Sequence, residues 1–298
     1  MKNRLTILLI ALLLFGCQEE TEQKEASASK PTSAVQPDLL NISIILDLSD
    51  RVVQPMQPSQ SERDIQVVNK ITEIFKNNMK AKGAFQAKDK IRVLFTPAPK
   101  DPNINSIASS LSVDLTKLDN KGKKDVYDNI TTTFTQGLEE IYAQAIRTKN
   151  WSGSDIWRFF KYDAKELCVD PNPQYRNVLV IVTDGYLYHS QSKDRQENKT
   201  AFITANFFQK EGFRDNSNWK EKFEKENYGL IASEQSYENL DVLVLEINPS
   251  PAHRNDEDII RAYLGKWFDE MKVGNKVLYN TDLPSNTEKR IESFFRSK

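Results

Sequence analysis

The chain has few of the residues that build disulfide frameworks, zinc sites and nucleotide-binding loops. Its 298 residues contain only two cysteines, two histidines and ten glycines. No Cys/His spacing typical of a zinc site occurs, and no glycine-rich phosphate loop is present. Cys168 has only His189 and His253 as candidate catalytic partners, and neither lies in a recognisable signature. A buried or incidental thiol is therefore favoured over a nucleophile.

The sequence also lacks a strong net charge and a long apolar run. Lysine and arginine total 41 and aspartate and glutamate total 42, which gives a formal net charge of −1. With this balance we expect no nucleic-acid partner. The longest apolar run is Leu5–Phe15, and it is shorter than the ~20 residues that a membrane-spanning helix needs.

The amino terminus has the features of an export signal. Lys2 and Arg4 precede the apolar run, which leads into Leu14-Phe15-Gly16-Cys17. This tetrad resembles the lipobox of bacterial lipoproteins. The resemblance implies a signal peptide at 1–16, cleavage before Cys17 and acylation of Cys17, which would anchor the protein to a membrane. The alternatives are a plain secretory signal or a buried apolar segment.

The residues after Cys17 indicate where such a lipoprotein would reside. Gln18 is not the aspartate that commonly retains lipoproteins in an inner membrane, and Glu19 and Glu20 resemble an acidic surface-export signal. We therefore expect a lipid-anchored protein of the bacterial cell envelope, at the outer membrane or cell surface. The stretch 17–37 has almost no large apolar side chains and is predicted to be a flexible tether. If Cys17 is acylated, Cys168 has no cysteine partner and the domain has no internal disulfide.

Residues 38–298 are long enough for one α/β domain with a full core. Apolar runs typical of strands alternate with segments of helical periodicity. The predicted strands lie at 42–46, 91–95, 111–115, 177–183, 242–247 and 277–279. This alternation predicts a doubly wound, mostly parallel central sheet of five or six strands flanked by helices, as in Rossmann-like folds.

The sequence predicts where two helices begin and which residues form the inner face of a third. Ser61 and Asp64 resemble a capping pair before one helix, and Ser285 with Glu288 resembles a capping box before the last. Another helix is marked by Phe134 and by apolar residues that follow it at helical spacing, so the threonines before Phe134 are expected at its start.

Two predicted strands end on aspartate. Ile42–Leu46 is followed by Asp47, and the run 177–183 is followed by Asp184. Since the carboxyl ends of parallel strands meet at one edge of a sheet, both side chains should lie at this edge, which we call the carboxyl rim. Two carboxylates ~4 Å apart repel by about 4 kcal/mol at an effective dielectric of ~20. A divalent cation or a cationic side chain is the usual remedy.

The motifs at these strand ends resemble those of the von Willebrand factor type A domain. The order of elements agrees, with Asp47-Leu48-Ser49 after the first strand, a threonine cluster at 131–135 and Thr183-Asp184-Gly185 after a central strand. The resemblance in the order of elements spans about 40–298. The motifs that carry it cover only a small part of that range. It implies a metal-ion-dependent adhesion site at the carboxyl rim.

The resemblance also implies ligands for that site. Asp47, Ser49 and Asp184 would hold Mg²⁺ or another divalent cation, together with a threonine that family spacing places at Thr132 or Thr133. In the family, an acidic residue of a partner protein completes the coordination. The simpler interpretation is that Asp47 and Ser49 only cap a loop.

The sequence departs from the family pattern at the third position of the first motif, where Arg51 replaces serine. A guanidinium cannot ligate a cation. Arg51 would neutralise Asp47 or Asp184 directly and replace the metal, so a metal-binding and a metal-free rim both stay open. Arg51, Tyr186 and Tyr188 are the predicted contacts with a partner protein.

These features favour a lipid-anchored protein-binding module for adhesion or recruitment, and not an enzyme. One alternative is a structural or assembly lipoprotein with a degenerate, metal-free site. The other is a hydrolase of the dehalogenase type, which also places an aspartate after its first strand. That chemistry requires Asp-x-Asp, and Ser49 occupies the place of the second acid.

Overall fold

The computed structural model describes residues 39–149, 151, 153–214, 216–249, 252–253 and 255–297. The predicted signal peptide, Cys17 and the tether lie outside this part of the chain. Residues 36–298 belong to one compact unit. None of the helices in the described residues is long and apolar enough to cross a bilayer.

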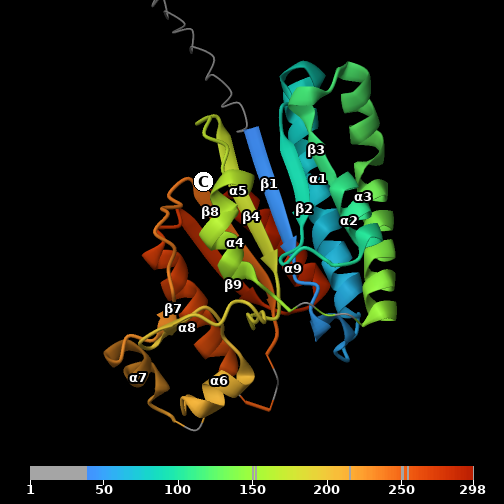
Figure 1. The fold of residues 1–298 in the computed structure, drawn as a ribbon. Helices are drawn as coiled ribbons and strands as arrows, with labels where there is room; N and C mark the ends of the chain where they lie inside the picture. Colours follow the sequence, from blue (N-terminus) through green and yellow to red (C-terminus); the bar gives the residue numbers. More distant parts are fainter. Residues whose placement is uncertain are drawn as a thin grey trace, which may run out of the picture. The chain divides into compact units, whose positions relative to one another are not determined.

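The centre of the domain is a six-stranded sheet with the order β3-β2-β1-β4-β8-β9 (Figure 1). Its strands are β1 (Leu39–Leu46), β2 (Lys90–Leu94), β3 (Ser112–Asp114), β4 (Tyr175–Val182), β8 (Leu240–Ile247) and β9 (Asn275–Asn280). Neighbouring strands are parallel except for the edge pair β2–β3. The predicted doubly wound, mostly parallel α/β fold is confirmed.

Helices cover both faces of this sheet (Figure 1). They are α1 (Gln60–Gln86), α2 (Pro102–Ser110), α3 (Asn120–Thr148), α4 (Ile156–Tyr162), α5 (Ala164–Cys168), α6 (Ala205–Lys210), α7 (Trp219–Lys225), α8 (Asp256–Glu270) and α9 (Pro284–Arg296). Short 3-10 turns form η1 (Asp50–Val53) and η2 (Leu115–Lys117). Because side chains alternate along a strand, Ile42 and Ile44 pack in the core with α1, α3 and α9, while Ile45 packs in the core with α4, α5 and α8.

The long segment between β4 and β8 carries a small aromatic layer. It contains α6, α7 and a three-stranded sheet of β5 (Arg195–Gln196), β6 (Lys199–Thr200) and β7 (Gly229–Leu230). The ring of Tyr263 in α8 lies 4.9 Å from that of Phe223 and 6.2 Å from that of Phe207, measured between centroids. These loop aromatics therefore pack onto α8 and are not free for a partner.

The helix starts differ from the predicted ones. Ser59, not Ser61, caps α1: its side chain accepts from the amide of Glu62, and the Glu62 carboxylate accepts from the amide of Ser59. Helix α9 begins at Pro284 with Leu283 at its N-cap and no side-chain cap, so the predicted box at Ser285 does not form. Pro284 occupies the first helical position instead. Proline is favoured there because the N–H that it lacks would have no partner within the helix.

Candidate functional site

Asp47 and Asp184 follow the two neighbouring central strands, β1 and β4. From this pair the sheet extends in opposite directions, to β2 and β3 on one side and to β8 and β9 on the other. The crevice outside the carboxyl ends of such strands is where open α/β sheets bind ligands. The fold therefore brings both predicted carboxylates to the place where the strand order reverses direction, which we call the switch point of the sheet.

Asp47 is held by hydrogen bonds from both sides of this switch point. Its side chain is only 1% exposed. Oδ1 accepts from the amide of Ser49 at 3.0 Å, and Oδ2 accepts from the hydroxyl of Thr183 at 2.7 Å. Thr183 belongs to the Thr-Asp-Gly motif, but sequence reasoning assigned it no role of its own. Its hydroxyl fixes the Asp47 carboxylate and joins the loops after β1 and β4.

The turn after β4 holds Asp184 in place. Its Oδ1 accepts from the amide of Tyr186 at 2.9 Å, and its carbonyl accepts from the amide of Asn248 at 3.1 Å. Gly185 has φ +96°, and a Cβ there would lie 2.6 Å from Cγ2 of Ile260. Glycine is required because both the backbone conformation and the close approach of α8 exclude a side chain.

Arg51 is turned into the protein beneath these carboxylates. It is 2% exposed, and its Nε donates to the carbonyl of Asp47 at 2.8 Å. Nη2 donates to the carboxylate of Asp64 at 2.5 Å and to the carbonyl of Val182 at 3.2 Å. Arg51 thus ties the ends of β1 and β4 to α1. The prediction that Arg51 contacts a partner is wrong, because the guanidinium is buried.

Asp64 completes a buried polar cluster with Arg51, Tyr142 and Gln60. Its carboxylate accepts from the Tyr142 hydroxyl at 2.5 Å and from the Gln60 amide at 3.0 Å. Burial acts to lower the pKa of Arg51, but the charges of Asp64 and Asp47 outweigh it and raise that pKa above its ordinary value. Sequence reasoning missed this cluster, although Asp64 lies on the inward stripe of α1 with Val67, Val68 and Ile71, where an acid needs a partner.

The position of Arg51 leaves Asp184 with little compensation. Burial and the charge of Asp47 raise the pKa of Asp184 to about 7, while the hydrogen bond from Tyr186 and the charge of Arg51 only partly oppose them. The side chain of Asp184 remains partly exposed at the carboxyl rim. The expected direct neutralisation by Arg51 is therefore incomplete, because the guanidinium bonds to Asp64 and to backbone carbonyls.

Thr132 and Thr133 do not lie at this site, and their prediction as cation ligands is corrected. Both are exposed in the middle of α3, which begins at Asn120 and ends at Thr148. Thr133 is 15 residues before that end, or about 22 Å at 1.5 Å per residue. The threonines were expected at a helix start, but Asp119 caps α3 well before them.

The two predicted tyrosine contacts have different environments. The hydroxyl of Tyr186 donates to Asp256 at 2.6 Å, and its ring packs on Phe208. Asp256 is fully buried and also accepts from Arg214 Nε at 2.9 Å. Tyr188 is 46% exposed. Tyr188 is therefore available at the carboxyl rim, whereas Tyr186 serves the packing of the segment after β4.

A serine, a histidine and an aspartate also meet in the rim loops. The Ser192 hydroxyl donates to Oδ1 of buried Asp155 at 2.7 Å, and His189 Nδ1 lies 3.0 Å from Asp155 Oδ2. Activation of a serine nucleophile requires its hydroxyl to donate to the imidazole. Here the hydroxyl proton is directed to Asp155, so the cluster holds two loops together and does not form a triad.

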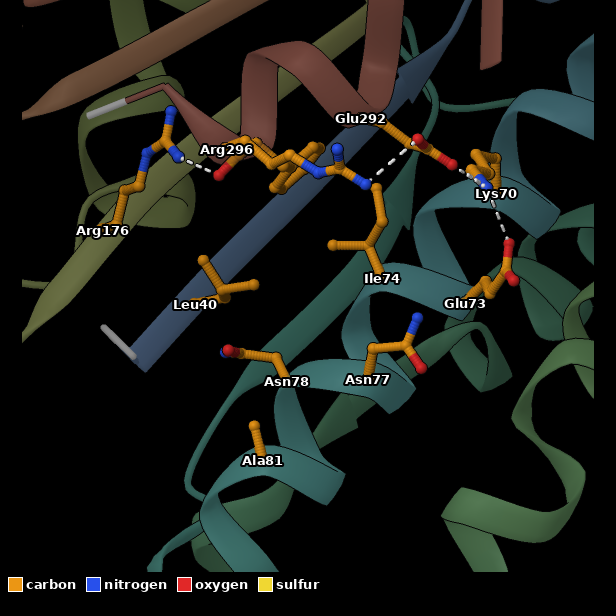
Figure 2. Close-up of a pocket in the computed structure, with 11 residues that line it drawn as sticks. Leu40, Lys70, Glu73, Ile74, Asn77, Asn78, Ala81, Arg176, Glu292 and Arg296 are labelled. Carbon is orange, nitrogen blue, oxygen red and sulfur yellow. Dashed lines mark hydrogen bonds and ion pairs between the residues drawn. The ribbon is translucent and has the colours of Figure 1, made fainter. Parts of the chain in front are cut away.

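Cavities lie at both ends of the sheet. One of about 290 Å³ opens at the carboxyl rim beside Leu48, between the loop after β2 and the end of α3, where Trp151 lines it. Figure 2 shows another, of about 380 Å³, between α1 and α9 near the start of β1. There Lys70 pairs with Glu73 and Glu292, and Arg296 also pairs with Glu292. The charged side chains that line this second cavity are therefore paired, Arg176 with Asp241 outside the lining.

The donors at the carboxyl rim fit a divalent cation only in part. Asp47, Ser49 and Asp184 supply oxygen atoms, and Mg²⁺ commonly takes one or two carboxylates and keeps several waters. Within the described ranges, no group of three or more His, Cys, Asp or Glu side chains is arranged around a common metal position. Burial and the charge of Asp47 raise the pKa of Asp184, and a bound cation would oppose both effects.

The comparisons with known proteins add little to the geometry of the site. No family model matches the chain, and no curated protein matches it. Its structure is similar to the crystal structure of an aerotolerance-related membrane protein from Bacteroides fragilis. That similarity has 14% identity and a TM-score of 0.36, and it covers 86% of this chain and 98% of the other. A likeness of this degree carries no argument about function.

Proposed function

We propose that the protein is a lipid-anchored binding module of the cell envelope that recruits a protein partner through its carboxyl rim. The observation that carries this proposal is the partly exposed carboxylate of Asp184 beside Asp47 at the switch point of the sheet, with a charge that Arg51 does not fully offset. Such a site favours a cationic ligand. Ser49 and the two carboxylates would hold a divalent cation, which in turn would accept an acidic residue of the partner.

Other features of the carboxyl rim support contact with a protein. Val53 after β1, Tyr188 after β4 and Leu283 after β9 are 44%, 46% and 67% exposed. Exposed apolar and aromatic side chains around a polar centre are typical of interfaces. The cavity beside Leu48 would accept one apolar side chain of the partner.

Calorimetric titration of Mn²⁺ and Mg²⁺ into the full chain tests the cation. Asp184→Asn and Asp47→Asn are the site variants, and Asp50→Asn is the matched control because Asp50 is exposed beside the site but is not a proposed ligand. We expect saturable binding that both site variants abolish and the control retains. At pH 6 to 7 binding should also release a proton, because the cation would ionise Asp184.

The metal-free version is the second candidate, and the buried Arg51 beneath the site favours it. In that case no variant and no wild-type protein binds either cation, and the partner is recognised without an ion. A photo-crosslinking residue at Tyr188 then tests the surface in native membranes, with Tyr162 as control because it is 56% exposed on α4. Equal cross-linking from both positions would refute a partner at the carboxyl rim.

A further inference from the structure

The end of the domain opposite the carboxyl rim presents an isolated aromatic side chain. Phe85 is 87% exposed, the highest value among the large apolar side chains of the described residues. It lies in the last turn of α1, which follows Gly83, and Gly83 breaks the helical geometry with φ +73°. A Cβ on Gly83 would meet no atom within 4 Å, so Gly83 faces open space.

This turn lies at the end where the chain enters the domain. Asp89, shortly after the turn, accepts from the amide of Leu40 at 2.7 Å, and Leu39 is the first residue of β1. In Figure 1 the start of β1, the end of α1 and the start of α3 are all at the upper end of the sheet. Phe85 is therefore near the end of the domain at which β1 begins.

Several lysines lie near Phe85 in the sequence or at the start of α3. Lys123 Nζ donates to the carbonyl of Ala84 at 2.9 Å, which places the start of α3 against the turn. The segments 80–89 and 114–128 contain seven lysines and five aspartates, a net charge of 7 − 5 = +2. Lys80, Lys88 and Lys121 are exposed and form no ion pair with another described residue, whereas Asp89 is buried and bonded to Lys82.

We propose that this surface, formed by Phe85 with Lys80, Lys88 and Lys121, rests on an anionic lipid surface. An aromatic ring among flexible lysines suits a bilayer interface, where the ring enters the apolar boundary and the ammonium groups meet headgroup phosphates. A single exposed ring needs no shaped partner in lipid.

The length of the preceding chain supports this occupant. Leu39 is 39 − 17 = 22 residues after Cys17, a separation of at most about 75 Å. An acylated Cys17 would keep the surface near the bilayer at high effective concentration, so a weak intrinsic affinity is sufficient.

Site-specific labelling of the full chain, purified from membranes, tests the contact. Phe85→Cys carries an environment-sensitive fluorophore, and Leu283→Cys is the matched control because it is 67% exposed at the carboxyl rim. Cys168 is buried and does not compete for the label. The vesicles contain either phosphatidylglycerol with phosphatidylcholine or phosphatidylcholine alone.

We expect the label at 85 to shift to the blue and to escape aqueous iodide on the anionic vesicles only, while the label at 283 stays quenched. Neutralisation of Lys80 or Lys121 by Gln should lower the ratio of lipid-inserted to free protein about fivefold for each lysine. Equal quenching at 85 and 283, or failure of the protein to sediment with anionic vesicles, would overturn the proposal. Protection at 85 in native membranes but not in pure lipid would identify a protein occupant instead and would equally overturn it.

Discussion

Asp184 is a residue whose protonation the fold shifts into the neutral pH range. Its pKa rises from an ordinary 3.8 to about 7 through burial and the nearby Asp47. Between these values the folded state binds more protons than the unfolded state, so the free energy of unfolding falls as the pH rises from about 4 to about 7. The stabilising contribution is complete below pH 4 and is lost above pH 7.

Asp184→Asn should therefore stabilise the protein at pH 8 and leave its stability at pH 4 almost unchanged. Because Asp184 is partly exposed, we expect a gain of about 1–3 kcal/mol at pH 8. Asparagine can still accept from the amide of Tyr186, so the turn is preserved. Urea denaturation at both pH values measures the difference. If wild type and variant lost stability in parallel between pH 4 and 8, another group would be responsible.

Arg51 makes a different contribution, through the burial of opposite charges. Arg51→Met leaves Asp64 without its cation in a site that is 0% exposed. Removal of one partner from a buried ion pair typically costs about 3–5 kcal/mol. We expect a loss of this size by urea denaturation, and partial recovery when Asp64→Asn is added. Without any recovery, the effect of the single variant would come from packing and not from the unpaired carboxylate.

At the scale of elements, the cap of α1 distinguishes two adjacent candidates. The Ser59 side chain accepts from the amide of Glu62, whereas Ser61 contributes only a hydroxyl contact with Ser59 at 3.2 Å. Ser59→Ala should lower the free energy of unfolding by about 1 kcal/mol, and Ser61→Ala should change it by a few tenths at most. Thermal unfolding of both variants measures this. Equal losses would contradict the assigned cap.

The strands were predictable from the sequence because their apolar runs are long and continuous. The run before Asp184 is buried on both faces in β4, and the polar alternation at 111–115 corresponds to the antiparallel edge strand β3. Helix ends were less predictable. Serines and acids at suitable spacing occur both at Ser59 and at Ser61, and the chain entering the helix decides between them.

The carboxylates of the candidate site were predictable, but their surroundings were not. A strand that ends on aspartate fixes the edge at which Asp47 and Asp184 lie. The direction of the Arg51 side chain depends on Asp64 and Tyr142, which come from helices 13 and 91 residues further along the chain. Local sequence carries no information on that pairing. The prediction of Thr132 and Thr133 as cation ligands was wrong for a related reason, because the family spacing did not account for the 29 residues of α3.

At the scale of the whole molecule, Asp256 joins the segment after β4 to the main body. It lies at the start of α8, is fully buried, and binds both Arg214 and Tyr186. Asp256→Ala should free Arg214 and loosen α6 and α7 before the central sheet unfolds. Hydrogen exchange should therefore accelerate in α6 and α7 while β1 and β4 stay protected.

Arg214→Gln provides the comparison for this prediction, because it leaves the hydrogen bond between Tyr186 and Asp256 intact. We expect a smaller acceleration in α6 and α7 than in Asp256→Ala. Uniform acceleration across the sheet and the segment would mean that both unfold as one cooperative unit.

The length of the central strands sets the distance between the two ends of the sheet. Strand β1 has eight residues, which span about 26 Å at ~3.3 Å per residue. With Phe85 against lipid and β1 along the bilayer normal, Asp184 would face the aqueous compartment about that far above the headgroups. A molecule embedded in the same bilayer would then need a projecting stalk of similar length to reach it, whereas a soluble or oppositely anchored molecule would meet it directly. The orientation of one strand would thus select partners by the compartment from which they approach.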